Sequence, residues 1–398
     1  MIGSITLTGI KSIRQATANL APLTILIGPN GSGKSTVLEG IELIGNAASE
    51  LLTPEAEGFY ETEHSQKGIR RGHLPSDPLK ITRNQGFGAI RGPKPLASVT
   101  AKVLAGWSMG VVPVWGTVRL TFPGGMPGAP AYFTLTLEGS DPGGLGALPP
   151  TPIGNADLLT QASQIISLPI TRADWPPRYD EESARTPIGN AYSPPEQGPP
   201  HLIALRERMS RALEIIRRNS PKSTRLREIG LNLFGVDWTG SHPTRPELVE
   251  SRAWRVAFEE ASFGTRQFFP AVVHLLALKE GETLLIEEPE ISLHPRAQLE
   301  TGRLLVEASQ AGRQVVATTH SHYVILGVLH AVRQGVLQPD DVAILECQKG
   351  QQGTRIVPRP VQKSGNIDGW IRQFARIDEY IFQAWMDSLE GQPGERVN

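Results

Sequence analysis

The sequence predicts an α/β protein with a mixed β-sheet, an antiparallel β subdomain and an inserted lobe that is partly helical and partly irregular. Three observations support this prediction. A strand, a glycine-rich turn and an apolar helix follow one another near the N-terminus, β-rich runs separated by glycine and proline occupy residues 98–138, and helices alternate with strands from residue 258 onward. Such alternation is typical of parallel strands covered by helices.

The composition indicates a globular chain with a buried core. Of the 398 residues 39% are apolar, and 39 basic side chains nearly balance 40 acidic ones. A polyanionic partner would therefore need a local basic patch. The single cysteine, Cys347, excludes an intramolecular disulfide framework and a thiolate zinc cluster, and is typical of a small apolar core residue.

The sequence contains no pattern that predicts export or membrane insertion. Met1–Ile10 alternates apolar and polar residues like a strand and lacks the long apolar core of a signal peptide. Apolar runs such as Ala271–Leu278 are shorter than the roughly 20 residues that cross a bilayer. We therefore expect a cytoplasmic protein with no membrane partner.

The first third of the chain is expected to begin a nucleotide-type α/β unit and then continue as β structure. Ile5–Leu7 and Leu23–Ile27 have the pattern of short strands, and Ser35–Ile44 that of an apolar helix. Three further runs separated by turn residues predict an antiparallel meander, namely Ser98–Leu104, Thr117–Phe122 and Tyr132–Leu137.

The middle of the chain changes in character twice. Residues 139–200 are crowded with proline and glycine, which predicts an irregular insertion. A basic helical pattern follows over His201–Asn219, and this helix and the next segment carry Arg206, Arg208, Arg211, Arg217, Arg218, Lys222, Arg225 and Arg227. A solvated helix face and a contact with DNA are both open interpretations, but no aromatic residues interleave for stacking on single strands.

The last third returns to alternating helix and strand. Helices are expected over Gln267–Leu278 and Pro295–Gln310, and strands over Thr283–Ile286 and Gln314–Thr318. A strand at Val342–Glu346 and a helix at Ile367–Leu389 complete the pattern. We accordingly divide the chain into residues 1–138 and 258–398, which form one nucleotide-binding domain, and residues 139–257, which are inserted into it.

A phosphate-binding loop is predicted between Leu23–Ile27 and the helix that follows. Gly28–Ser35 reads GPNGSGKS, which satisfies the GxxxxGK[ST] pattern in the strand-to-helix context that this loop requires. Glycines let backbone amides converge on phosphate oxygens, lysine adds a cation, and serine offers a hydroxyl to Mg²⁺. The predicted ligands of ATP are Asn30, Gly31, Ser32, Gly33, Lys34, Ser35 and Thr36, with Ser35 also on Mg²⁺.

Two further strand ends carry groups suited to hydrolysis. Thr283–Ile286 runs into Glu287 and Glu288, and we expect Glu287 to bind hydrated Mg²⁺ and Glu288 to deprotonate the attacking water. His320 follows the next strand and is expected to donate a hydrogen bond to the γ-phosphate. His294 and His322 are interpreted as structural or as groups that support the site residues, because no metal-ligand spacing pairs them with cysteine or with a helical HExxH pattern.

The order of these motifs resembles the ABC-type P-loop ATPase heads of the SMC, RecF and OLD group. Ile286–Glu290 reads IEEPE and Leu293–Pro295 reads LHP, as in OLD-like ATPases, and Ser262-Phe263-Gly264 stands where ABC proteins have their signature. The resemblance implies a homodimer that encloses two ATP molecules, with Ser262 and Gly264 of one subunit facing the phosphate loop of the other. It also implies a glutamine ligand of Mg²⁺, for which Gln85 is the choice here.

The resemblance leaves several functions open. The first is an ATPase switch in a DNA-maintenance or phage-defence system that acts with a separate effector protein. The alternative is a stand-alone RecF-like DNA-binding repair ATPase that uses the Arg206–Arg227 segment, and a transporter ATPase is disfavoured because no LSGGQ sequence is present. OLD nucleases continue into a Toprim domain, for which residues 321–398 are too few, so no nuclease domain is expected.

Overall fold

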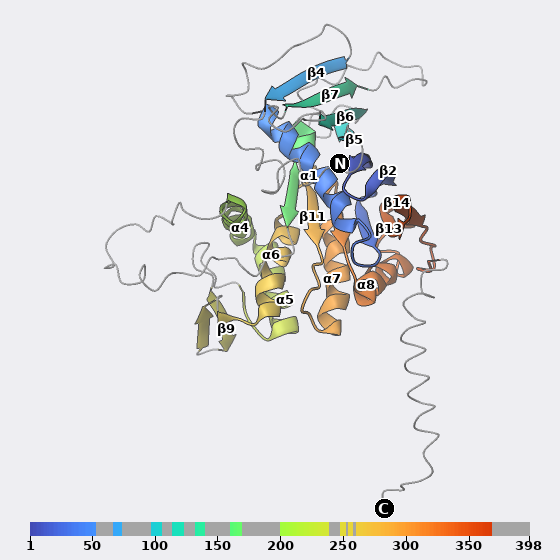
Figure 1. Ribbon diagram of the computed structural model, residues 1–398. Helices are drawn as coiled ribbons and strands as arrows, with labels where there is room; N and C mark the ends of the chain where they lie inside the picture. The colour runs from blue at the N-terminus through green and yellow to red at the C-terminus, as the bar shows by residue number, and fades with distance from the viewer. Residues whose placement is uncertain are drawn as a thin grey trace, which may run out of the picture.

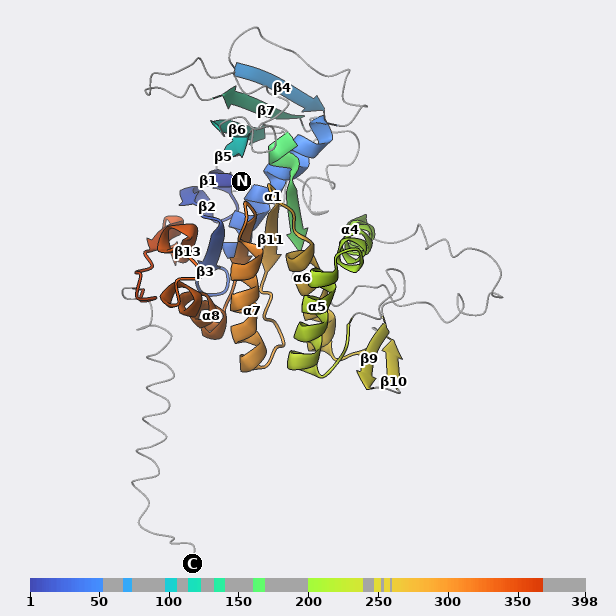
Figure 2. The same ribbon diagram turned by 180° about the vertical axis from the view of Figure 1, so that it is seen from behind.

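The computed structural model describes residues 1–52, 67–73, 97–105, 114–122, 132–139, 160–168, 200–238, 247–251, 254–257 and 260–367. These residues form two six-stranded sheets and a two-stranded ribbon. Helix α1 lies between the two large sheets, and a group of helices covers the opposite face of one of them (Figure 1; Figure 2). The architecture is the mixed α/β fold that the sequence predicts.

The mixed sheet has the strand order β14-β13-β3-β12-β11-β8. All neighbours are parallel except β13 and β14. Thr318 is in register with both Leu26 and Glu287, so β3, β12 and β11 end at the same edge of the sheet. The strands are β3 (Leu23–Ile27), β8 (Ile165–Leu168), β11 (Thr283–Glu287), β12 (Gln314–Thr318), β13 (Val342–Gly350) and β14 (Gly353–Arg359).

The second sheet is antiparallel and has the order β2-β1-β5-β6-β7-β4. Its consecutive pairs β5–β6 and β6–β7 confirm the predicted meander. A separate ribbon pairs β9 (Glu247–Ser251) with β10 (Trp254–Ala257). The strands of the sheet are β1 (Ile2–Ile10), β2 (Ile13–Asn19), β4 (Lys67–His73), β5 (Ala97–Ala105), β6 (Val114–Phe122) and β7 (Tyr132–Gly139).

Helix α1 (Lys34–Leu51) fills the space between the sheets. Val37 and Ile41 are buried there with Leu7 of β1 and Leu26 of β3. The β3 side chains of Leu23, Ile25 and Ile27 belong to a second core on the opposite face of the mixed sheet. Because successive strand residues point to opposite faces, a strand buried on both sides must be apolar throughout, as β3 nearly is.

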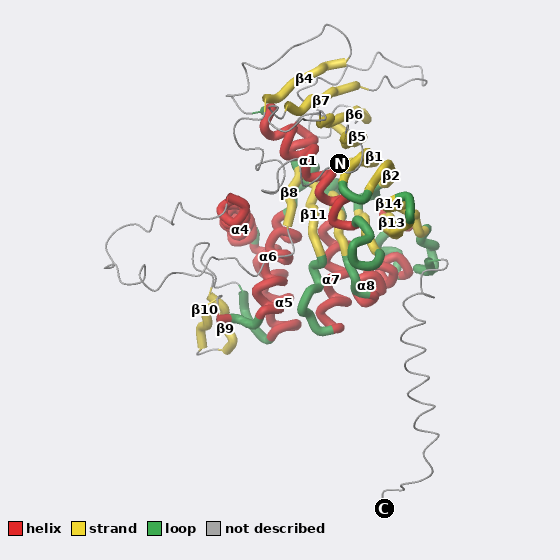
Figure 3. The backbone as a smooth tube through the Cα atoms, viewed as in Figure 1, coloured by secondary structure: helices red, strands yellow, loops and turns green. Residues whose placement is uncertain are grey.

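The second core joins the mixed sheet to its covering helices (Figure 3). Trp238 packs against Phe269 with ring centroids 5.3 Å apart and against Phe234 at the same separation. This aromatic cluster unites the segment 200–238 with α6, although the boundaries of the three predicted segments remain a prediction. The helices are α4 (Pro200–Arg217), α5 (Ser220–Phe234), α6 (Phe263–Ala277), α7 (Pro295–Ala308) and α8 (His322–Arg333), with a 3₁₀ turn at Pro339–Asp341.

The structure corrects one expectation and adds several elements to the predicted set. Ile165–Leu168 lies in the stretch predicted to be irregular, yet it forms β8 and pairs with β11, because this apolar run completes the sheet edge. The sequence analysis did not predict β2, β4, α5, β9, β10, α8 or β14. The predicted helix Ile367–Leu389 lies outside the described residues beyond its first position. Within the described residues, no helix has both the length and the apolar character needed to cross a membrane.

Candidate nucleotide-binding site

The loop between β3 and α1 is held in a shape that only glycine permits at two positions. Gly28 has a φ of +137°, and a Cβ there would lie 2.3 Å from the carbonyl oxygen of Cys347. Gly33 has a φ of +100°, and its Cβ would lie 2.8 Å from Oγ1 of Thr354. The loop can therefore lie directly against β13 and β14, a close approach that any side chain would prevent.

Lys34 is fixed over this loop. Its side chain is buried, with 6% exposure of the residue, and Nζ donates to the carbonyl oxygens of Gly28 (2.9 Å) and Pro29 (3.1 Å). Burial lowers the pKa of Lys34, and the negative charge of Glu288 opposes that shift. The ammonium group thus stands at the junction of loop and helix, where phosphate oxygens bind in loops of this type.

The remaining loop residues differ in accessibility. Asn30, Gly31 and Ser35 are exposed, whereas Ser32 and Thr36 are buried. Among the described residues the Ser32 hydroxyl has no hydrogen-bond partner. A buried polar atom without a partner is unfavourable, so the loop fits a ligand that supplies one, such as a phosphate oxygen.

The acidic end of β11 lies one strand away from β12 and two from β3. Glu287 ends the strand and is buried, and Glu288 adopts a left-handed φ of +41° that turns the chain sharply. The Glu288 N–H donates to the carbonyl oxygen (3.0 Å) and to Oγ1 (3.1 Å) of Thr318. These bonds hold the turn and aim the Glu288 side chain toward the loop that follows β12.

His320 follows β12, Lys34 follows β3 and Glu288 follows β11. Because β12 lies between β3 and β11, His320 lies between Lys34 and Glu288. Its Nε2 is 3.4 Å from Oε1 of Glu288. Burial lowers the pKa of His320, the positive charge of Lys34 lowers it further, and Glu288 opposes both. The imidazole is therefore neutral at pH 7 and can share one proton with a neighbouring oxygen.

Glu290 is a member of the site whose role the sequence analysis did not identify. Its Oε1 accepts hydrogen bonds from the Thr319 hydroxyl (2.6 Å) and from the His320 N–H (3.0 Å). Burial raises the pKa of this carboxyl group, and its hydrogen bonds oppose the shift. The sequence contained one sign of this role, because Glu290 is a third carboxylate directly after the buried strand, at a position where a surface loop would be expected.

The predicted magnesium ligands fit Mg²⁺ that is bound together with a nucleotide. Among the described residues, no group of three or more His, Cys, Asp or Glu side chains could hold a metal ion. Mg²⁺ commonly keeps several waters and takes one or two carboxylates with phosphate oxygens, which is the set that Ser35, Glu287 and ATP would supply. Gln85, the third predicted ligand, lies outside the described residues.

Comparisons with known proteins bear on the family and the fold of this chain. A family model described as "AAA ATPase domain" matches residues 1–82, and one described as "AAA domain, putative AbiEii toxin, Type IV TA system" matches residues 172–326. The DNA replication and repair protein RecF of Azotobacter vinelandii is 45% identical over 49 residues. The SMC head bound to the C-winged helix domain of ScpA superimposes with a TM-score of 0.54, at 14% identity, over 91% of this chain and 99% of that one.

The chain is similar to SMC- and RecF-like P-loop ATPases in its matched segments and in its fold. The match with RecF covers 12% of this chain and 13% of RecF, so the chain matches only a small part of that relative. The SMC head domain from Thermotoga maritima also aligns, over 90% of this chain and 98% of that one, with a TM-score of 0.43 and 14% identity. The similarity to the ScpA-bound head identifies the fold of the ATPase and leaves its partners open.

The segment predicted to be the signature begins α6. The exposed Ser262 caps the helix, since its Oγ accepts from the Thr265 N–H at 3.2 Å. A Cβ on Gly264 would lie 2.7 Å from the carbonyl oxygen of Ser292, in the loop that follows Glu290. The signature helix is thus packed against the acidic loop of its own chain, and the predicted contact with a second subunit remains a prediction.

The basic segment of the ATPase is partly neutralised by ion pairs that the sequence did not reveal. Arg227 pairs with Asp237 at 2.9 Å, and Arg218 pairs with Glu214. Arg225 contacts three carboxylates, those of Glu228, Glu300 and Glu307. These arginines are therefore less available to a polyanion than their number in the sequence implies.

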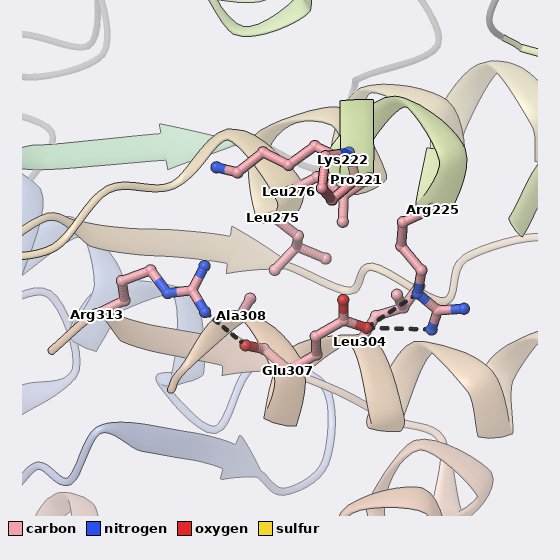
Figure 4. A pocket seen from close by; sticks show the side chains of 9 residues that line it. All are labelled: Pro221, Lys222, Arg225, Leu275, Leu276, Leu304, Glu307, Ala308 and Arg313. Carbon is pink, nitrogen blue, oxygen red and sulfur yellow. Dashed lines mark hydrogen bonds and ion pairs between the residues drawn. The ribbon is translucent and has the colours of Figure 1, made fainter. Parts of the chain in front are cut away.

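A small pocket adjoins this segment, and Figure 4 shows the side chains that line it. Its volume is about 160 Å³, and Lys222, Arg225 and Arg313 surround an apolar floor that includes Leu276 and Leu304. Burial and the charge of Arg313 lower the pKa of Lys222. Since Arg313 precedes β12 and the phosphate loop follows the parallel strand β3, the pocket is separate from the nucleotide site.

Proposed function

We propose that the chain is a switch that binds ATP, dimerises around it and opens again after hydrolysis. The observation that carries the proposal is the meeting of Lys34, Glu288 and His320 at one edge of the sheet, with 3.4 Å between Glu288 and His320. A cation, a general base and a hydrogen-bonding imidazole are groups suited to phosphoryl transfer to water.

Each residue has a defined part in the proposed reaction. The loop amides and Lys34 hold the β- and γ-phosphates, and Ser35 and Glu287 hold Mg²⁺, which neutralises phosphate charge when bound. Glu288 accepts a proton from the attacking water as the new oxygen–phosphorus bond forms and the bond to the ADP oxygen breaks. The neutral His320 has one N–H, which faces Glu288 at 3.4 Å in this structure and would turn to donate a hydrogen bond to the γ-phosphate when nucleotide is bound.

Dimerisation would complete the site. Ser262 and Phe263 are exposed at the start of α6, so they are accessible to a second copy of the chain. The amino end of a helix carries a partial positive charge, which favours contact with a γ-phosphate from the other subunit. Two-fold symmetry then produces two equivalent sites from one interface.

The biological role that we propose is in a DNA-maintenance or defence system with a separate effector protein. The toxin–antitoxin system named by the family model supports this role, as does the SMC head's complex with ScpA. The alternative, a RecF-like repair ATPase that binds DNA by itself, is supported by the short match with RecF and by the basic segment. The ion pairs of Arg218, Arg225 and Arg227 weigh against that alternative.

The test is light scattering of the Glu288→Gln protein on a sizing column, with and without ATP and Mg²⁺. We expect a dimer only when both are present, because the variant binds ATP and cannot cleave it. A second run with duplex DNA separates the roles, since co-elution supports a DNA-bound switch and an unchanged dimer supports a protein effector. A monomer under all conditions would refute the dimerisation mechanism.

A further inference from the structure

The carboxyl group of Glu290 is buried inside the loop region that carries the proposed catalytic groups. The residue is 5% exposed, and its Oε1 accepts two hydrogen bonds from the loop after β12, one from the Thr319 hydroxyl and one from the His320 N–H. Its Oε2 is buried and has no partner among the described residues. Burying a carboxyl group with one unpaired oxygen is unfavourable, so the fold accepts this residue at some loss of stability.

The same carboxyl group belongs to a ring of hydrogen bonds that ties two loops to two helices. The Thr319 hydroxyl accepts from the Ser321 N–H at 2.9 Å, and Ser321 caps α8 while its Oγ donates to Oε1 of Gln298 at 2.6 Å. Gln298 lies on α7 and donates to the carbonyl oxygen of Leu293 at 2.8 Å, in the loop of Glu290. The ring therefore joins the loop after β11, the loop after β12, α7 and α8, and the two helices lie side by side (Figure 2).

Within the described residues, few contacts hold the imidazole of His320. Its side chain is 34% exposed, and the ion-pair contact that it makes there, with Glu288, is long at 3.4 Å. The point from which the ring projects is set by the backbone at His320, and the N–H of this backbone is held by the side chain of Glu290. The backbone of Glu288 is likewise held by hydrogen bonds, which its N–H donates to Thr318.

We infer that Glu290 is a positioning residue for ATP hydrolysis: it holds the peptide of His320 so that the imidazole stands between Lys34 and Glu288. The inference rests on the proposed hydrolytic function. Glu290 itself does not touch the reacting atoms; it acts through His320. A displacement of about 1 Å in a catalytic group can lower a rate by roughly 100-fold, so loss of this bond is expected to affect turnover more than nucleotide affinity.

The experiment compares Glu290→Ala, Glu290→Gln and Thr319→Val with wild type. Glu290→Ala removes both bonds, Thr319→Val removes one, and Glu290→Gln keeps the accepting oxygen. The matched control is Thr301→Val, which removes another fully buried threonine hydroxyl, the one that donates to the Ala297 carbonyl oxygen on α7. Turnover number, KM, affinity for a fluorescent ATP analogue and unfolding temperature are measured for each variant.

We expect Glu290→Ala to lower kcat about 10- to 100-fold while the affinity for the analogue changes less than about threefold. Thr319→Val should lower kcat several-fold, Glu290→Gln should retain most activity, and Thr301→Val should lower only the unfolding temperature. Wild-type turnover in Glu290→Ala, or a Glu290→Gln variant as slow as Glu290→Ala, would overturn the inference. If Glu290→Ala does not fold, wild-type turnover in Glu290→Met, which keeps the length of the side chain but lacks the accepting oxygen, has the same meaning.

A second readout separates this inference from the proposed function. Hydrogen exchange of the His320 amide, measured without nucleotide, should be slow in wild type and in Thr301→Val and faster in Glu290→Ala. This difference does not depend on hydrolysis. Absence of ATPase activity in wild type with the exchange difference present would refute the proposed function alone, whereas unchanged exchange in Glu290→Ala would refute the positioning role.

Discussion

Replacement of Glu288 by glutamine tests the proposed base most directly, because the change leaves the shape of the side chain intact. The amide keeps the contact with His320 but cannot accept a proton from water at neutral pH. General bases contribute about 10²- to 10⁴-fold to a rate, so the variant should lose roughly 2.7–5.4 kcal/mol of transition-state stabilisation.

The stability of the fold should hardly change. Glu288 is 28% exposed on its side chain, and its partner His320 has a lowered pKa and is neutral at pH 7, so no full ion pair is lost. A half-exposed contact of this kind contributes less than about 1 kcal/mol. The backbone strain at Glu288, with a φ of +41°, is the same for glutamine.

The assay is steady-state ATPase activity with thermal unfolding and ATP affinity measured in parallel. Glu214→Gln is the matched control, since Glu214 is an exposed acid paired with Arg218 and lies outside the site. The control should behave like wild type in all three measurements. If Glu288→Gln retains more than about a tenth of wild-type kcat, the assignment of the base is refuted, and a loss of ATP affinity as large as the loss of kcat would mean that Glu288 binds nucleotide instead.

Three further outcomes follow from the geometry of the loop and of His320. Lys34→Ala should weaken ATP binding at least about 100-fold, because it removes charge-assisted hydrogen bonds of about 1.5–3 kcal/mol each; calorimetry that gives wild-type affinity would contradict the assignment. Gly28→Ala should destabilise the fold by more than about 2 kcal/mol in urea unfolding, whereas Gly235→Ala, with a φ of +70° and open space around it, should lose about 1 kcal/mol. Because the pKa of His320 is lowered in the folded state, protons bind preferentially to the unfolded chain as the pH falls. The contribution of His320 to the free energy of unfolding, measured against His320→Asn, should be fully present above about pH 6.5 and decrease as the pH falls toward the folded-state pKa. A pH-independent difference between the two proteins would contradict this.

Much of the candidate site was predictable because its signals are local. The GPNGSGKS loop, the acid pair after an apolar strand and the histidine after the next strand each lie within a few residues, and the structure brings Lys34, Glu288 and His320 to one sheet edge. Their roles remain predictions. Gln85 lies outside the described residues, and Ser262 is seen in the structure as a helix cap.

Interactions between distant segments were not predictable in the same way. Apolar periodicity predicts a strand but not its neighbours, so β8 was hidden among prolines and glycines until its pairing with β11 was seen. The charges of Arg225 and Arg227 could be counted, but their partners Glu300, Glu307 and Asp237 come from other elements or from beyond the helix end. A basic composition therefore overstates a basic surface.

The sequence by itself determined that this chain forms a phosphate loop on a parallel strand and places carboxylates and an imidazole at the ends of two more strands. Only the tertiary structure decided that β12 lies between β3 and β11, which sets His320 between Lys34 and Glu288. It also decided that Glu290 accepts from Thr319 and His320 rather than facing solvent. The reason is physical: backbone propensity acts between near neighbours, whereas strand order and buried hydrogen bonds depend on how the whole core packs.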